Sequence, residues 1–169
     1  MTIYPLRKLR LRPGEEHRDE VPIQLEPFDL GGERYLPVPA EAPSELTISR
    51  ATGGDVFRLR FETRLHGPCV RCLEDAVATI DVDAHEYHSG GDGADEQLRS
   101  AYIVDDRLEL SVWARDAIAL ELPEQILCRP DCAGLCPVCG VNLNVEPHEH
   151  PDERGDPRWD TLAELRDRL

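Results

Sequence analysis

The segment Val56-Phe-Arg-Leu-Arg-Phe-Glu-Thr-Arg-Leu65 has the alternation of a β-strand with one buried face. From position 57 onward its odd-numbered residues are Phe, Leu, Phe, Thr and Leu, and its even-numbered residues are Arg, Arg, Glu and Arg. Successive side chains point to opposite faces of a strand, so this period of two predicts an apolar face towards a core. The opposite face would carry Arg58, Arg60 and Arg64 in one row.

The flanking residues extend this strand into a sheet. Residues 45–51 (ELTISRA) also alternate, and Thr52-Gly-Gly-Asp55 has the composition of a turn, which predicts a hairpin over 45–65. A further alternating segment, 76–87 (AVATIDVDAHEY), predicts another strand.

A helical pattern follows the strands. Apolar residues recur at helical spacing over about 110–121, where Ser111 is a candidate N-cap and Pro123 ends the helix. Because the strands cluster before the helix, we expect an α+β fold, with a mostly antiparallel sheet and one covering helix. A cysteine-rich zinc knuckle and a short terminal helix, opening at Asp156-Pro157, would complete the C-terminal part.

The length of 169 residues is that of one domain. We expect a basic N-terminal arm (1–20), a β-rich body with its helix (21–122), a zinc-knuckle segment (123–150) and a C-terminal helix (151–169). No apolar run approaches the roughly 18 residues of a membrane span, and residues 1–12 lack the apolar core of a secretory signal. These features lead us to expect a cytoplasmic protein without membrane contact.

The net charge excludes one broad class of nucleic-acid binder. The chain has 19 Lys and Arg against 34 Asp and Glu, a formal charge of −15. A surface that binds phosphates through overall positive charge is therefore ruled out. Contact with RNA would need a local patch, for which the candidates are Arg7 and Arg10 in the arm and the sheet row with Arg71.

The strongest chemical signal is a run of four cysteines in Cys128-x3-Cys132-x3-Cys136-x2-Cys139, followed by Gly140. In a cytosolic protein such spacing favours a metal site over disulfides. Structural zinc takes four ligands in a tetrahedron, and thiolates are its commonest ligands. The sequence therefore predicts structural zinc on Cys128, Cys132, Cys136 and Cys139.

Four other residues are alternative ligands. His148 and His150 follow closely enough to complete a Cys2His2 site with Cys136 and Cys139. The separate pair Cys69-x2-Cys72 can supply a further half-site, act as a dithiol, or simply be buried at a turn. A zinc ion with four protein ligands has no open position for water. The sequence also lacks the G-x-S-x-G, P-loop, G-x-G-x-x-G and H-E-x-x-H motifs, so we expect no enzyme.

Two motifs resemble the YceD family, named for accumulation of large-subunit ribosomal RNA. The first is Cys69-Val-Arg-Cys72-Leu-Glu74. The second starts at Leu120-Glu-Leu-Pro123, includes the four-cysteine run and Asn142-Leu-Asn144, and ends with Asp156-Pro-Arg158 and Leu162. The match in order and spacing covers about residues 45–169, and Arg12-Pro-Gly14 is similar to actinobacterial members. Many relatives have Cys-x-Cys where this chain has His148 and His150, a change that retains metal ligands.

The resemblance implies a non-enzymatic role in the synthesis, processing or stability of large-subunit ribosomal RNA in the cytoplasm. The expected partners are the large-subunit ribosomal RNA precursor, ribosomal proteins, or both, with no small-molecule substrate. The alternative hypothesis is a thiol-based redox or zinc-sensing switch at Cys69 and Cys72. A nuclease is a third hypothesis, but no motif supports it.

Overall fold

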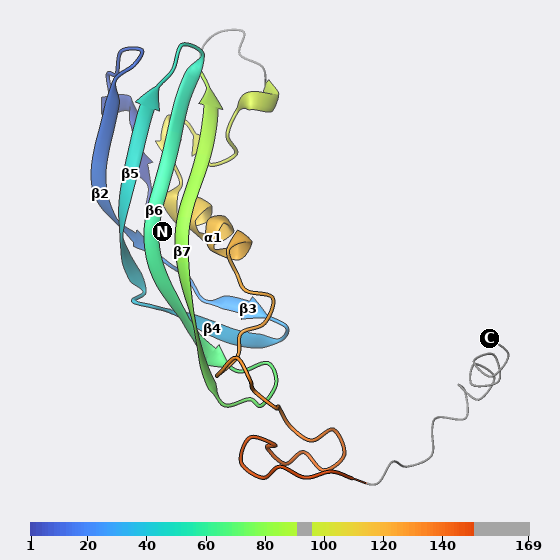
Figure 1. The fold of residues 1–169 in the computed structure, drawn as a ribbon. Helices are drawn as coiled ribbons and strands as arrows, with labels where there is room; N and C mark the ends of the chain where they lie inside the picture. The colour runs from blue at the N-terminus through green and yellow to red at the C-terminus, as the bar shows by residue number, and fades with distance from the viewer. Residues whose placement is uncertain (91–95, 151–169) are drawn as a thin grey trace, which may run out of the picture.

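The central element of the fold is one long strand, β6 (Gly54–Pro68), in a six-stranded sheet (Figure 1). The computed structural model describes residues 1–90 and 96–150. β7 (Asp75–Ser89) pairs antiparallel with β6 along its whole length. On the other edge of β6, β5 (Glu41–Arg50) pairs with residues 55–60 and β4 (Glu33–Val38) with residues 64–66. The predicted hairpin and the strand over 76–87 are confirmed.

The remaining strands were not predicted. β2 (Glu16–Gln24) pairs with β5, and β3 (Phe28–Leu30) pairs with β4. A small second sheet joins β1 (Tyr4–Pro5), β9 (Arg107–Leu108) and β8 (Ile103–Val104) in that order. Two 3-10 turns, η1 (Leu6–Lys8) and η2 (Glu96–Leu98), complete the described elements.

The helix α1 (Leu110–Leu120) covers one face of the main sheet, and its predicted position is confirmed. It buries Leu110, Trp113, Ala114, Ala117 and Ile118. The prediction that Ser111 caps the helix is wrong. Glu109 precedes the helix without a side-chain cap bond, whereas the Ser111 hydroxyl donates to the Gln24 carbonyl at 2.8 Å. Ser111 therefore ties the helix to β2.

The core lies between α1 and the inner face of the sheet. The inner face is apolar because every second residue of β5, β6 and β7 points towards the helix. Its fully buried members include Leu46, Ile48, Phe57, Leu59, Leu65 and Ile80. The opposite face, which we call the open face, carries the alternating charged residues. An antiparallel sheet with one covering helix agrees with the predicted α+β class; the predicted terminal helix lies outside the described residues.

One end of the sheet holds all the predicted metal ligands. The β6–β7 turn lies there, and the chain beyond α1 runs to the same end (Figure 1). The backbone N–H of Val70 in that turn donates to the Ile126 carbonyl at 3.1 Å, which fixes the two segments together. Gly67 just before the turn is required by packing, since a Cβ there would lie 2.3 Å from the Tyr35 ring.

Candidate metal centres

The structure gathers the six cysteines and two histidines into two clusters. Cys69, Cys72, Cys128 and Cys132 form the four-cysteine cluster, and Cys136, Cys139, His148 and His150 form the Cys2His2 cluster. Within each cluster the ligand atoms all lie within 4.8 Å of one another. The predicted set of Cys128, Cys132, Cys136 and Cys139 is thus divided: its first half meets Cys69 and Cys72, and its second half meets the histidines.

Each cluster is built on a six-residue turn, and the two turns have the same conformation. In Cys69–Glu74, the N–H of Leu73 donates to the Cys69 carbonyl at 3.0 Å and the N–H of Cys69 donates to the Glu74 carbonyl at 2.7 Å. In Cys136–Val141, Gly140 donates to Cys136 and Cys136 donates to Val141, both at 2.8 Å. The residue after the second cysteine has a left-handed backbone in both turns, with φ of 63° at Leu73 and 76° at Gly140. This geometry points two sulfurs of each turn at one place.

The four-cysteine cluster has the spacing of a tetrahedral zinc site. The Sγ atoms of Cys69 and Cys132 are 3.7 Å apart, and those of Cys72 and Cys128 are 3.5 Å apart. Four sulfurs at about 2.3 Å from one zinc ion lie about 3.8 Å from each other. All six cysteines are free of disulfides. The residues therefore fit a divalent metal with thiolate ligands.

Arg71 holds this cluster together from inside the turn. Its guanidinium donates to the Cys132 carbonyl and to the Gln125 side chain, both at 3.1 Å, and its carbonyl accepts from the Leu135 N–H at 3.0 Å. Gly134 packs against the same carbonyl, where a Cβ would come within 3.2 Å. Arg71, predicted as a binding residue for RNA or a partner, thus has a structural role between the two cysteine pairs.

Asn144 is a positioning residue that sequence reasoning did not identify as part of the site. Its side-chain amide donates to Cys132 Sγ at 3.5 Å, and its side-chain oxygen accepts from the Ala133 N–H at 2.8 Å. The same amide donates to the Asn142 side chain at 2.7 Å. A donor to a ligating sulfur offsets its negative charge and orients it. The signal was present in Asn142-Leu-Asn144, which carried the resemblance but received no role.

Backbone donors favour the thiolate in each cluster. Burial opposes ionisation of Cys69, but the N–H groups around it outweigh this effect and lower its pKa to about 6. At Cys136 the N–H of Cys139 is the largest influence, and the pKa again falls to about 6. Burial and the neighbouring thiols raise the pKa of Cys128 to about 12. Without a cation the four thiols cannot all ionise, so a bound divalent metal would provide the missing positive charge.

The Cys2His2 cluster also has ligand spacings that suit zinc. The Nε2 atoms of His148 and His150 lie 3.2 Å apart and are 3.1 and 3.4 Å from Cys139 Sγ. Tetrahedral zinc separates two nitrogens by about 3.3 Å and a nitrogen from a sulfur by about 3.5 Å. His148 Nδ1–H donates to the Glu146 carbonyl at 2.9 Å, which leaves Nε2 unprotonated and able to bind metal.

The predicted arginine row on the open face is neutralised by acids. Arg58 makes two hydrogen bonds with Asp83, at 2.7 and 2.6 Å. Arg60 lies 3.9 Å from the same carboxylate, and Arg64 lies 4.0 Å from Glu62. This arrangement leaves little positive charge for phosphate.

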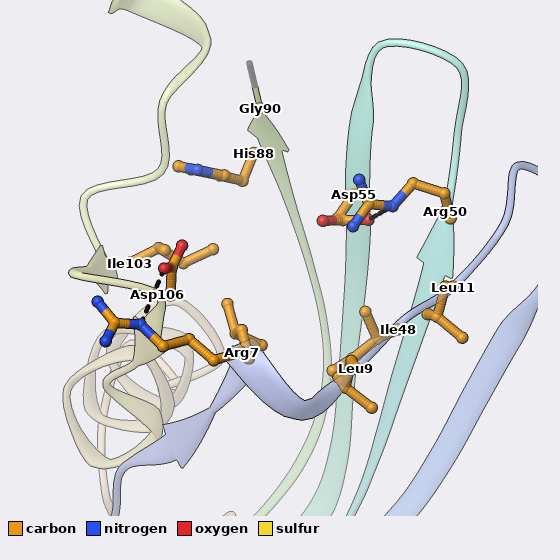
Figure 2. Close-up of a pocket in the computed structure, with 11 residues that line it drawn as sticks. Arg7, Leu9, Leu11, Ile48, Arg50, Asp55, His88, Gly90, Ile103 and Asp106 are labelled. Atoms are coloured by element: carbon orange, nitrogen blue, oxygen red, sulfur yellow. Dashed lines mark hydrogen bonds and ion pairs between the residues drawn. The ribbon is translucent and has the colours of Figure 1, made fainter. Parts of the chain in front are cut away.

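The N-terminal arm presents its cations differently. Arg7 pairs with Asp106 at 3.1 Å, whereas Lys8, Arg10 and Arg12 form no ion pair with any described residue. Leu6, Leu9 and Leu11 pack against the core and hold the arm over a cavity of about 540 Å³ (Figure 2). The cavity also contains the Arg50–Asp55 pair at 2.6 Å. Its guanidinium groups already face carboxylates, so the free positive charge lies on the outside of the arm.

The fold and clusters define a class of protein: an antiparallel sheet with two Cys/His clusters of metal-binding geometry at one end. The chain belongs to the YceD family, whose model, described as large ribosomal RNA subunit accumulation protein YceD, matches residues 57–166. That range includes both clusters. Among the described residues, no helix has the length and apolar character to cross a membrane.

The relatives add little about mechanism. Uncharacterized proteins of Mycobacterium tuberculosis and Mycobacterium leprae are 40% identical over 104 residues and 36% identical over 101 residues, respectively. These matches cover 59% and 57% of this chain but 49% and 46% of the relatives, so the chain spans about half the length of the curated relatives it matches. A maize protein, large ribosomal RNA subunit accumulation protein YCED homolog 1, chloroplastic, is 45% identical over 41 residues, or 24% of this chain and 14% of its own. No solved structure gives a significant match.

Proposed function

We propose that this protein is a non-enzymatic cytoplasmic factor for the synthesis, processing or stability of large-subunit ribosomal RNA, with two structural zinc ions. The single observation that carries the proposal is the match of the family model over the part of the chain that contains both clusters. The family description supplies the link to ribosomal RNA, and the ligand geometry supports zinc.

Zinc in this proposal stabilises the fold and does no chemistry. Each cluster offers four protein ligands, which fill a tetrahedral coordination shell and leave no position for a reacting water. The number of zinc ions tests this directly: elemental analysis of purified protein should give two per chain. A ratio of one would remove one cluster from the proposal, and none would refute the structural zinc.

The thiol-switch hypothesis has weaker support. Cys69 and Cys72 each lie next to a sulfur of the other pair, so a disulfide between them would have to break up a four-ligand site. Reversible oxidation of this pair with zinc retained would favour the switch over the structural site.

RNA contact, where it is direct, is best supported at the N-terminal arm. Lys8, Arg10 and Arg12 form no ion pair with residues 1–90 or 96–150. Each phosphate contact would contribute about −0.7 to the slope of log binding constant against log salt concentration on single-stranded RNA. Basic ribosomal proteins are the other proposed partners, because the chain has a charge of −15.

The test is crosslinking in growing cells with sequencing of the recovered RNA. We expect enrichment at discrete positions of large-subunit precursor RNA, lost when Lys8, Arg10 and Arg12 are changed to Ala. The matched control changes Arg58, Arg60 and Arg64 to Ala, which removes the same charge from the open face. Recovery of no RNA above background would overturn direct binding and leave the route through ribosomal proteins.

A further inference from the structure

A groove runs between the outer edge of the sheet and α1. It has a volume of about 250 Å³ and is lined by β7 from Val82 to Glu86 and by Tyr102, Trp113, Ala117, Leu120 and Glu121. Its floor is apolar, since Val82, Trp113 and Ala117 are buried. Leu120 at the end of α1 is 86% exposed, although it borders this apolar floor. The groove therefore offers both apolar surface and access from solvent.

One wall of the groove is a strand edge without a partner. Among residues 1–90 and 96–150, β7 pairs only with β6, so its other edge is an outer edge of the sheet (Figure 1). An edge strand of this kind has unpaired N–H and C=O groups directed outward. An extended peptide can pair with such groups and place alternate side chains into an adjoining apolar groove.

The negative charge of the groove favours a basic peptide. Glu86 and Glu121 line it, and neither forms an ion pair with a described residue. Asp83 also lines it, but Arg58 already neutralises that carboxylate. No lysine or arginine is among the lining residues. The local field thus favours basic side chains.

We propose that this groove binds an extended basic segment of a partner protein, which adds to β7 as a further strand. On the side of the segment that faces α1, apolar residues would contact Val82, Trp113 and Leu120, and basic residues would face Glu86 and Glu121. A second copy of this chain fits less well, because β7 against β7 would bring Asp81 and Glu86 close to acids of the partner strand, and no lysine or arginine lines the groove. The proposal is independent of the zinc sites and of RNA binding.

Fluorescence of Trp113 gives a direct test, because the chain has two tryptophans and Trp159→Phe leaves Trp113 as the sole tryptophan, which can be excited selectively over the four tyrosines. The probe is the nine-residue peptide Val-Thr-Lys-Thr-Val-Thr-Lys-Thr-Val with blocked ends, which presents valine and lysine on one side and is called the valine–lysine peptide. It is added to the full-length variant. We expect a saturable change in Trp113 emission. The valine–glutamate peptide, in which glutamate replaces both lysines, should give none.

Two comparisons separate strand addition from simple charge attraction. Changing both Glu86 and Glu121 to Gln should weaken binding by about fivefold or more, whereas Glu20→Gln with Glu33→Gln, which removes two exposed acids elsewhere, should change it by less than about twofold. N-methylation of alternate peptide nitrogens should weaken binding by about tenfold, because it removes main-chain donors.

Several results would overturn the proposal. Unchanged Trp113 emission, equal binding of the valine–glutamate peptide, or equal binding of the N-methylated peptide would each do so. Concentration-dependent self-association through β7 that the valine–lysine peptide does not displace would assign the groove to a second copy instead.

Discussion

The two Cys/His clusters are built on turns of the same conformation. They differ in how far along the chain the second pair of ligands lies. In the four-cysteine cluster, Cys72 contacts Cys128, which is 56 residues away. In the Cys2His2 cluster, Cys139 contacts His148, which is nine residues away. A metal in the first joins the β6–β7 turn to the segment beyond α1, and a metal in the second closes a local loop. The same turn therefore links distant segments in the four-cysteine cluster and closes a local loop in the Cys2His2 cluster.

Burial follows the same division. Three of the four cysteines in the first cluster are buried, whereas Cys136 alone is buried in the second. Because the first cluster joins two segments that are far apart in the chain, its loss should lower the stability of the whole fold. Loss of the second should be confined to about residues 134–150.

The largest effect should come from Cys69→Ser compared with Cys139→Ser. Each change should remove one zinc ion per chain. Cys69→Ser should also lower the free energy of unfolding by about 3 kcal/mol or more, since it removes the metal that joins the β6–β7 turn to the segment beyond α1. Cys139→Ser should change the unfolding of the sheet by less than about 1 kcal/mol, because its surroundings are exposed. Urea unfolding followed by circular dichroism, with zinc analysis, measures both.

Equal destabilisation by the two changes would contradict the difference in structural role between the two clusters. It would mean that the Cys2His2 cluster also supports the sheet. Val145→Ala, which shortens an 80% exposed side chain in the same segment, is the control for nonspecific effects.

The sequence predicted local structure but not the contacts between segments that are distant in the chain. The period-two pattern located β5, β6 and β7, and the helical spacing located α1. The predicted ligand set was based on closeness in sequence, which grouped Cys128, Cys132, Cys136 and Cys139. Their actual partners could not be inferred, because the meeting of the β6–β7 turn with residues 126–135 is set by tertiary packing. The histidines could be considered as alternative ligands because they are local to Cys139, and the structure places them beside it.

Charged residues show a related limit. The row of Arg58, Arg60 and Arg64 was correctly placed on one face by its spacing, but its neighbours across the sheet were unknown. Register puts Arg60 opposite Asp83 and Glu62 opposite Asp81, so acids accompany the row. β2 was missed because six of its nine residues are charged or His, or Pro, which weakens the alternating pattern.

Metal removal should be the next largest effect. A zinc chelator added to the native protein should take the two ions at rates that differ by at least about tenfold, with the Cys2His2 ion first, because exposed ligands exchange more readily than buried ones. A zinc-sensitive dye follows the release, and the Cys139→Ser variant identifies the fast phase by its absence. A single phase with two ions would show that the clusters are coupled.

Asn144→Leu should have a smaller effect that falls on the four-cysteine cluster alone. The change keeps the size of the side chain but removes the donor to Cys132 Sγ, and loss of such a contact typically lowers metal affinity by about tenfold. Asn142→Leu is the matched control, because Asn142 contacts Asn144 but no sulfur in the structure. Competition with a chelator of known affinity measures both. An equal loss in the two variants would assign the effect to loop structure and not to the sulfur contact.

The smallest effect concerns the residue that follows the second cysteine, which is Leu73 in one turn and Gly140 in the other. Leu73 and Gly140 occupy the same left-handed position, but only glycine adopts it without steric cost, which for other residues is about 1–2 kcal/mol. Leu73 is 60% exposed, so its side chain contributes little burial in return. Leu73→Gly should therefore raise the free energy of unfolding by up to about 1 kcal/mol after the entropy of glycine in the unfolded chain is subtracted. Gly140→Ala should lower zinc retention at the Cys2His2 cluster without shifting the unfolding of the sheet. If Leu73→Gly instead destabilises the protein, the Leu73 side chain supports the four-cysteine turn, and the two turns are equivalent in backbone geometry only.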